Sequence, residues 1–221
     1  MATRAFKDDL YSRFAQVAAA LGSPRRFELA ELLAQGERSV EELALETDLS
    51  VANASQHLQR LLRANLVAAR RQGARVFYRL ASREITGLLL AVRQTTERHD
   101  SSLSRILQLH LRRRSDEEVL PEEVARRLDD PSLVLLDVRP IREYDAGHIA
   151  GAQALPIDEL AKRRRLPFAK KCEIIAYCRG PYCTFADEAV EILRKRGYRA
   201  RRMRIGFPEW EELGLATVRS A

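Results

Sequence analysis

The chain has few cysteines and no long apolar run, and these shortages exclude several classes of protein. Three cysteines in 221 residues are too few for a disulfide framework, and they fit a reducing compartment. No apolar run approaches the roughly 18 residues of a membrane span, and the opening segment continues into a helical pattern unlike a secretory signal. We therefore expect a soluble, cytoplasmic protein that does not contact a membrane.

The excess of positive charge lies entirely in the first half of the chain. Residues 1–114 contain 19 Lys and Arg against 12 Asp and Glu, whereas residues 115–221 contain 19 of each. A compact basic part joined to a neutral part indicates that the first binds a polyanion and that the second has another task.

The basic part has the pattern of a winged helix. Apolar residues recur at helical spacing. Ser23-Pro24 opens a second helix, with Ser as the cap and Pro in the first turn, and Ser39 with Glu42 forms a capping-box pattern. Helices are predicted over residues 6–21, from 24 onward, over 39–47 and over 51–64, and strands over 66–71 and 75–80. A helix-turn-helix followed by a hairpin makes a mainly α winged helix-turn-helix fold with a β-hairpin wing.

Residues 82–114 read as one long helix with a seam that repeats near every 3.5 residues. The seam consists of Ile85, Leu89, Val92, Thr96, His99, Leu103, Ile106 and His110. The same helix of a second copy is its simplest partner, so we expect a homodimer through the helices at 1–20 and 82–110. The alternative is a helix that packs only within its own chain. A charge run marks a linker at 112–118 and predicts domains at 1–111 and 119–221.

The predicted helix 51–64 presents polar side chains opposite an apolar face. Its amide and hydroxyl groups are suited to base edges in the major groove, and arginines there and in the hairpin to phosphates. The candidate DNA-binding residues are Ser50, Asn53, Ser55, Gln56, His57, Gln59, Arg60, Arg70, Arg71 and Arg75. The expected partner is a double-stranded DNA operator; the alternative is an ordinary solvated helix.

This half resembles the ArsR/SmtB family of dimeric winged-helix repressors, through residues 50–66 and the wing at 72–78. The resemblance covers residues 1–110 and implies DNA binding. Many members sense metals, but the positions that match their ligands carry other residues here. These positions are Ser39 and Glu41 near one helix, and Ser82, Glu84, Thr95 and Arg98 near the last. Glu97, His99 and His110 show similar spacing, but they lie some 15 residues too late and the final ligand would be Arg113. A zinc site there is the alternative to two partly buried seam histidines. We therefore predict no metal ligands and no cofactor.

The neutral half alternates strands with helices, which predicts an α/β domain. Strands are expected over residues 133–138, 172–177 and 200–205, and helices over 121–128 and 184–196. Between the second strand and its helix lies the segment Cys178, Arg179, Gly180, Pro181, Tyr182 and Cys183, here called the cysteine loop. Convergent backbone N–H groups and the helix dipole favour a thiolate at Cys178, to which Arg179 adds positive charge. Inert packing is the alternative.

This half looks like a rhodanese domain over residues 121–218, through its segments 136–139, 143–152, 178–183 and 206–210. The resemblance implies that Cys178 accepts a sulfane sulfur from a donor and carries it as a persulfide. Asp137, Arg139 and His148 then read as a paired buried charge and scaffold polar groups. The related Cys-based phosphatases need an arginine where this chain has Thr184, so phosphoryl chemistry is not expected.

Cys183 stands where rhodaneses commonly carry a basic residue, which sets this loop apart. Two cysteines five positions apart around a tight loop can come within disulfide range or be bridged by an extra sulfur. Cys183 as a packed helix residue is the alternative, and Cys172 is expected to be structural.

These patterns support a DNA-binding repressor whose rhodanese-like domain senses reactive sulfur or thiol-oxidising species through Cys178 and Cys183. Modification is expected to release the DNA. Two other hypotheses stay open. One is a thiosulfate or polysulfide sulfurtransferase that forms a Cys178 persulfide, with the winged helix regulating its own gene. The other is a sensor of arsenite or another thiophilic ion.

Overall fold

The computed structural model describes residues 3–111 and 118–219 and divides into two compact units, Met1–Val92 and Arg93–Ala221. Of the predicted linker at 112–118, only Glu118 lies within the described residues. In the described part of the chain, no helix is long and apolar enough to cross a membrane.

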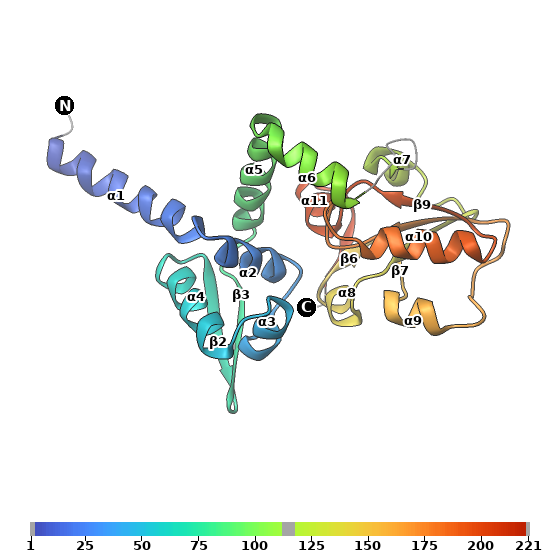
Figure 1. Cartoon of the computed structure of the whole chain (residues 1–221), viewed down its shortest axis with the longest axis horizontal. Coiled ribbons are helices and arrows are strands. Elements are labelled where there is room, and N and C mark those ends of the chain that lie inside the picture. The colour runs from blue at the N-terminus through green and yellow to red at the C-terminus, as the bar shows by residue number, and fades with distance from the viewer. Residues whose placement is uncertain (1–2, 112–117, 220–221) are drawn as a thin grey trace. The chain divides into compact units, whose positions relative to one another are not determined.

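The first unit is a winged helix (Figure 1). Its helices are α1 (Arg4–Leu21), α2 (Pro24–Ala34), α3 (Val40–Glu46) and α4 (Val51–Arg63). Its strands are β1 (Arg38–Ser39), β2 (Val67–Gln72) and β3 (Arg75–Leu80). The hairpin β2–β3 forms the predicted wing, and β1 adds an antiparallel strand on the other side of β3, which the sequence analysis did not foresee. The predicted fold class of this half is confirmed.

Local side-chain bonds fix the helix-turn-helix. The predicted capping box is present: the Ser39 hydroxyl accepts from the N–H of Glu42, and the Glu42 carboxylate accepts from the N–H of Ser39. The Ser50 hydroxyl likewise accepts from the N–H of Asn53 at 3.2 Å and opens α4. Ser23 occupies the N-cap position of α2 and Pro24 the first turn, as expected, although the Ser23 side chain makes no capping hydrogen bond.

Residues 82–114 do not form one long helix, and that prediction is wrong. The structure has α5 (Glu84–His99) and α6 (Ser101–Leu111), which are separated at Asp100. The Asp100 carboxylate accepts from the N–H of Ser102 at 2.9 Å and caps the start of α6. Because the units divide at Val92, the segment Arg93–His99 of α5 belongs to the second unit.

The second unit contains a five-stranded parallel sheet in the order β4-β9-β8-β5-β7. These strands are β4 (Glu118–Val119), β5 (Leu133–Asp137), β7 (Gln153–Ala154), β8 (Glu173–Tyr177) and β9 (Arg199–Met203). A separate antiparallel pair joins β6 (His148–Ile149) to β10 (Thr217–Val218). The helices are α7 (Pro121–Arg126), α8 (Ile141–Ala146), α9 (Ile157–Lys162), α10 (Phe185–Lys195) and α11 (Phe207–Glu212). The expected α/β class is confirmed.

Alternate residues of the central strands point into two apolar cores. Ile174 and Ala176 of β8 pack in one core with residues of α9 and α10. Ile175 and Tyr177 pack in the other with residues of α7 and α11, including Trp210. The sheet is therefore covered on both faces, as parallel sheets require.

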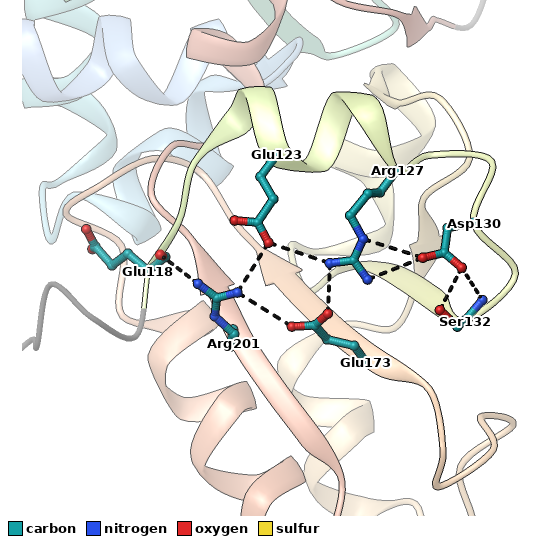
Figure 2. Close-up of polar contacts among 7 residues, drawn as sticks. All are labelled: Glu118, Glu123, Arg127, Asp130, Ser132, Glu173 and Arg201. Atoms are coloured by element: carbon teal, nitrogen blue, oxygen red, sulfur yellow. Dashed lines mark hydrogen bonds and ion pairs between the residues drawn. The ribbon is translucent and has the colours of Figure 1, made fainter.

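A network of charged side chains ties the short strand β4 and α7 to the middle of the sheet (Figure 2). Arg127, which caps the end of α7, donates to Glu173 of β8 at 2.8 Å, and Arg201 of β9 lies 3.3 Å from Glu123 and 3.6 Å from Glu173. Arg201 also donates to the backbone carbonyl of Glu118 at 3.2 Å. The two arginines thus share carboxylates from α7 and β8, and this network fixes the start of β4 in the five-stranded sheet.

Candidate functional site

The cysteine loop lies at the carboxyl end of β8, the central strand of the sheet. Cys178 follows Tyr177 directly, and α10 begins at Phe185. Within the loop, the N–H of Cys183 donates to the carbonyl of Gly180 at 3.2 Å and closes a turn. The carboxyl ends of strands in open parallel sheets are the usual place for ligand sites.

The loop brings the two cysteines together. The Cys178 thiol donates to the carbonyl of Cys183 at 3.6 Å and to that of Gly180 at 3.8 Å, and a hydrogen bond to the Cys183 side chain shifts the pKa values of the two thiols in opposite directions. Backbone N–H groups surround the pair: those of Gly180 and Ala186 act on Cys178, and those of Arg179 and Phe185 act on Cys183. The convergence of loop amides that the sequence suggested is therefore present, but it serves two sulfurs instead of one.

Burial separates the chemistry of these two sulfurs. Cys178 is 2% exposed, and burial raises its pKa well above the ordinary value, whereas Cys183 is only half-buried. The hydrogen bond from Cys178, which outweighs the effect of burial, lowers the pKa of Cys183 to about 7. Burial therefore opposes the thiolate expected at Cys178, and which of the two cysteines carries it stays a prediction. The thiolate is favoured at Cys183, because a protonated Cys178 donates to it and two N–H groups point to it.

Arg179 forms an ion pair away from the loop centre. Its Nη2 lies 2.5 Å from Oε1 of Glu143, a carboxylate that is 1% exposed. The guanidinium still helps to lower the pKa of Cys183 through its charge. In the sequence, Glu143 stands out only as the first residue of the motif at 143–152. Its separation of 36 residues from Arg179 left no local signal of the pairing.

The start of α11 forms one wall of the loop. The N–H of Phe207 donates to the carbonyl of Cys178 at 3.3 Å. A Cβ atom at Gly206 would lie 2.3 Å from the nitrogen of Gly180, which leaves room for glycine alone. The Glu209 carboxylate accepts from the N–H of Gly206 at 3.0 Å and stands beside Gly180. Glu209 is a second residue near the site to which the sequence assigned no role.

The remaining polar residues of the rhodanese pattern make structural contacts within the same domain. Asp137 and Arg139 are both fully buried and form an ion pair with an Oδ2–Nη2 distance of 2.6 Å, as predicted. Arg139 also donates to the carbonyl of Gly147 at 2.8 Å. The His148 ring stacks on Tyr144, with centroids 3.7 Å apart. Cys172 is buried in the core shared with α9 and α10.

The other candidate surface is α4 and the wing of the first unit. The apolar face of α4 is expected to comprise Ala54, Leu58, Leu61 and Leu62. The first three are fully buried, and Leu62 is half-buried against the same core. Of the candidate DNA-binding residues, Ser50, Asn53, Gln56, Gln59, Arg60, Arg70, Arg71 and Arg75 are exposed, and Ser55 and His57 are half-buried. Partial burial and the charges of nearby arginines lower the pKa of His57, so it is uncharged near neutral pH.

Besides Ser50, which caps α4, the candidate DNA-binding residues Gln59 and Arg70 have protein partners. Gln59 donates to the hydroxyl of Tyr78 on β3 at 3.2 Å, which joins α4 to the wing. Arg70 donates through Nε to the Glu37 carboxylate at 2.8 Å, and its guanidinium lies 4.8 Å from the centre of the Phe77 ring. Arg71 and Arg75 at the tip of the wing remain exposed. These are the wing charges most open to a phosphate backbone.

The positions compared with metal ligands of the arsR-type repressors show no metal site within the part of the chain that the structure describes. Among residues 3–111 and 118–219, no group of three His, Cys, Asp or Glu side chains could hold a metal ion. Arg113 lies outside the described residues, and the side chain of His110 is likewise not described.

Comparison with known proteins finds two families in this chain, one in each half. Residues 23–69 match the bacterial regulatory protein, arsR family, and residues 120–213 match the rhodanese-like domain. Both resemblances inferred from the sequence motifs are confirmed.

Similar proteins match either the whole chain or its first half. The chain is 38% identical over 209 residues to the HTH-type transcriptional regulator Rv0324 of Mycobacterium tuberculosis, which covers 95% of this chain and 92% of that protein. It is 42% identical over 72 residues, 33% of this chain and 62% of that protein, to the biofilm growth-associated repressor of Agrobacterium fabrum. A solution structure from Mycobacterium bovis, of a homodimeric winged helix-turn-helix domain, is 37% identical with a TM-score of 0.42. It covers 46% of this chain and 93% of that one.

Proposed function

The chain is a transcriptional regulator of the arsR family that carries a rhodanese-like domain, and we propose that it is a repressor that senses reactive sulfur through Cys178 and Cys183. The observation that carries this proposal is the hydrogen-bonded pair of sulfurs in the cysteine loop. One is a buried thiol and the other a half-buried sulfur that favours the thiolate. This arrangement suits a sulfur exchange that ends in a covalent link between them.

The proposed chemistry begins at Cys183. Its thiolate attacks one sulfur of a hydropolysulfide such as HSSH; a new S–S bond forms, the S–S bond of the donor breaks, and HS⁻ leaves. The Cys178 sulfur then attacks the Cys183 sulfur, and a second sulfide leaves with the proton of the Cys178 thiol. Two cysteines are oxidised to a disulfide and the sulfane sulfur is reduced to sulfide, so no other oxidant is needed. Attack on the outer sulfur instead moves the persulfide to Cys178.

The first unit supplies the DNA-reading surface in this proposal. Asn53 and Gln56 are exposed on α4, where amide groups are suited to base edges. Arg71 and Arg75 at the wing are suited to phosphates and supply the salt-dependent part of the affinity. The operator is expected to be a double-stranded DNA with two-fold symmetry.

A homodimer is part of the same proposal. Phe6, Tyr11 and Phe14 of α1 are each more than half exposed, and Val92 of α5 is 40% exposed. Apolar side chains of this size along one helix suit burial against a second copy. Sedimentation velocity of the full chain should give a dimer, and Phe14→Glu should shift it toward the monomer. A wild-type monomer at micromolar concentration would contradict this part.

A sulfurtransferase and an arsenite sensor are the competing functions, and both use the same loop. Steady turnover of thiosulfate or polysulfide with cyanide at about 1 per second or faster would favour the enzyme. Binding of arsenite to the two cysteines without any persulfide or disulfide would favour the ion sensor.

The test is the affinity of the full chain for DNA from its own promoter, measured by fluorescence anisotropy at fixed salt. We expect polysulfide treatment to weaken binding about 5- to 150-fold, and a thiol reductant to restore it. Cys183→Ser should abolish the response while leaving the affinity of the reduced protein unchanged. Cys172→Ala is the matched control and should respond like wild type. Tight binding that ignores polysulfide would overturn the proposal.

A further inference from the structure

Side chains at the end of α5 contact the cysteine loop within the second unit. Arg93 lies with its Nη1 atom 2.9 Å from Oε1 of Glu209, and its guanidinium carbon is 4.7 Å from the centre of the Tyr182 ring. The Tyr182 hydroxyl donates to the Glu97 carboxylate. One arginine and one glutamate, four residues apart and so on the same face of the helix, therefore hold the tip of the loop.

Two features strengthen these contacts. The side chains of Arg93 and Glu209 are only 14% and 12% exposed, so water screens their attraction less than it would on the surface. Glu209 is held in turn by the N–H of Gly206. Burial and the charge of Glu97 raise the pKa of Tyr182 to about 12, so its hydroxyl keeps its proton and remains a donor near neutral pH.

These contacts restrict movement of the loop backbone next to the reacting cysteines. A Cβ atom at Gly180 would lie 3.2 Å from Oε1 of Glu209 and 3.6 Å from Nη1 of Arg93, so the backbone rests directly against this ion pair. Two hydrogen-bonded sulfurs must approach by more than about 1 Å to form a bond of about 2.05 Å. Tyr182 precedes Cys183 in the chain, so a movement of Cys183 also moves Tyr182.

We propose that Arg93 and Glu97 are positioning residues that hold the cysteine loop in its reduced shape, and that bridging of Cys178 and Cys183 releases Tyr182 from them. The second part rests on the sulfur chemistry proposed above. These two residues carry the signal out of the loop because α5 begins at Glu84, and its residues Ile85 and Leu89 belong to the core of the winged helix. The helix is the stretch of chain that links the loop's contacts to the DNA-reading unit.

The experiment uses the full-length variants Arg93→Gln and Tyr182→Phe, with Arg98→Gln on the same helix as the matched control. The first readout is the rate of alkylation of Cys183 by iodoacetamide at pH 7, followed by mass spectrometry. Both variants should react several-fold faster than wild type, and the control should not. Tyr182→Phe removes one hydroxyl and keeps the test valid if Arg93→Gln fails to fold. Unchanged rates in both variants would overturn the positioning role.

The second readout is the ratio of DNA affinities before and after polysulfide treatment, together with the mass of the bridged product. In both variants the ratio should fall to less than about half of the wild-type ratio, although the bridge still forms. If variants that form the bridge keep the wild-type ratio of affinities, the proposed release of Tyr182 is overturned, whereas the sensing function is not. If polysulfide leaves the DNA affinity of the wild type unchanged, both the proposed function and the release of Tyr182 are contradicted. The alkylation rates still decide the positioning role in that case.

Discussion

The thiol of Cys178 is a hydrogen-bond donor to the sulfur of Cys183, five residues further along the chain. This relationship gives the two cysteines opposite tendencies: the buried one keeps its proton, and the half-buried one loses it near pH 7. A reactive thiolate and a protected thiol are thus held next to each other, which is the starting arrangement for a bridge between them.

The first prediction concerns the pH dependence of alkylation. The thiolate is the reactive form, and its fraction rises with pH through the pKa. The rate at Cys183 should therefore be half-maximal near pH 7, below the value of about 8.5 expected for an ordinary cysteine. Cys178→Ala removes the donor and should move this midpoint upward.

The complementary variant tests the assignment of the two thiols. In Cys183→Ser, the remaining loop thiol is the buried Cys178, whose raised pKa should keep it almost unreactive below pH 9. Cys172 and Cys178 share the tryptic peptide 172–179, so fragmentation of that peptide in tandem mass spectrometry is needed to assign the alkylated residue. A midpoint near pH 7 in Cys183→Ser would mean that the thiolate belongs to Cys178 instead.

The second prediction concerns the contact between α11 and the cysteine loop. In Gly206→Ala the new methyl group would lie 2.3 Å from the nitrogen of Gly180, so the loop or the helix must move. Overpacking of this kind costs typically about 1–3 kcal/mol, and the unfolding temperature should fall by several degrees. Gly22→Ala is the control, because its Cβ would meet nothing closer than 3.5 Å. Equal unfolding temperatures for the two variants would show that the loop yields without cost.

Elements governed by neighbouring residues could be predicted from the sequence. The capping box at Ser39 and the apolar face of α4 are such elements, and both are present. The break at Asp100 was missed because the apolar seam continues across it, while the cap depends on a single side chain. The order of the two pKa values, with Cys183 below Cys178, could not be predicted for another reason. It depends on how deeply Cys178 is buried once β8 joins the sheet, and no local pattern encodes that burial.

Partners of the loop that lie far away in the chain could not be predicted from the sequence either. The contact between Tyr182 and Glu97 spans 85 residues, and that between Arg179 and Glu143 spans 36. Glu97 in particular reads as an ordinary solvated side chain until the fold brings it to the loop. The motifs therefore located the site, whereas its electrostatics required the tertiary structure.

The third prediction concerns the buried ion pair behind the loop. Asp137→Asn leaves the Arg139 guanidinium fully buried beside a neutral amide. Removing one partner of a buried pair costs about 3–5 kcal/mol, because the other charge stays without compensation. Urea denaturation should show this loss in the transition of the second unit. Glu191→Gln, which breaks an exposed pair with Lys195, is the control and should leave that transition unchanged. A loss below about 1 kcal/mol for Asp137→Asn would contradict the expectation.

The last prediction concerns the wing arginines, which differ in how free they are to bind DNA. Arg71→Gln and Arg75→Gln each remove an exposed charge, so each should reduce the slope of log K against log salt by about 0.9. Arg70→Gln should have a smaller effect, because the Arg70 guanidinium is already bound by Glu37. By the same reasoning, Glu37→Gln releases Arg70 and should tighten binding to any DNA sequence. Anisotropy titrations at several salt concentrations measure all four variants. Weaker binding by Glu37→Gln would contradict this expectation and show that the ion pair between Glu37 and Arg70 maintains the shape of the wing.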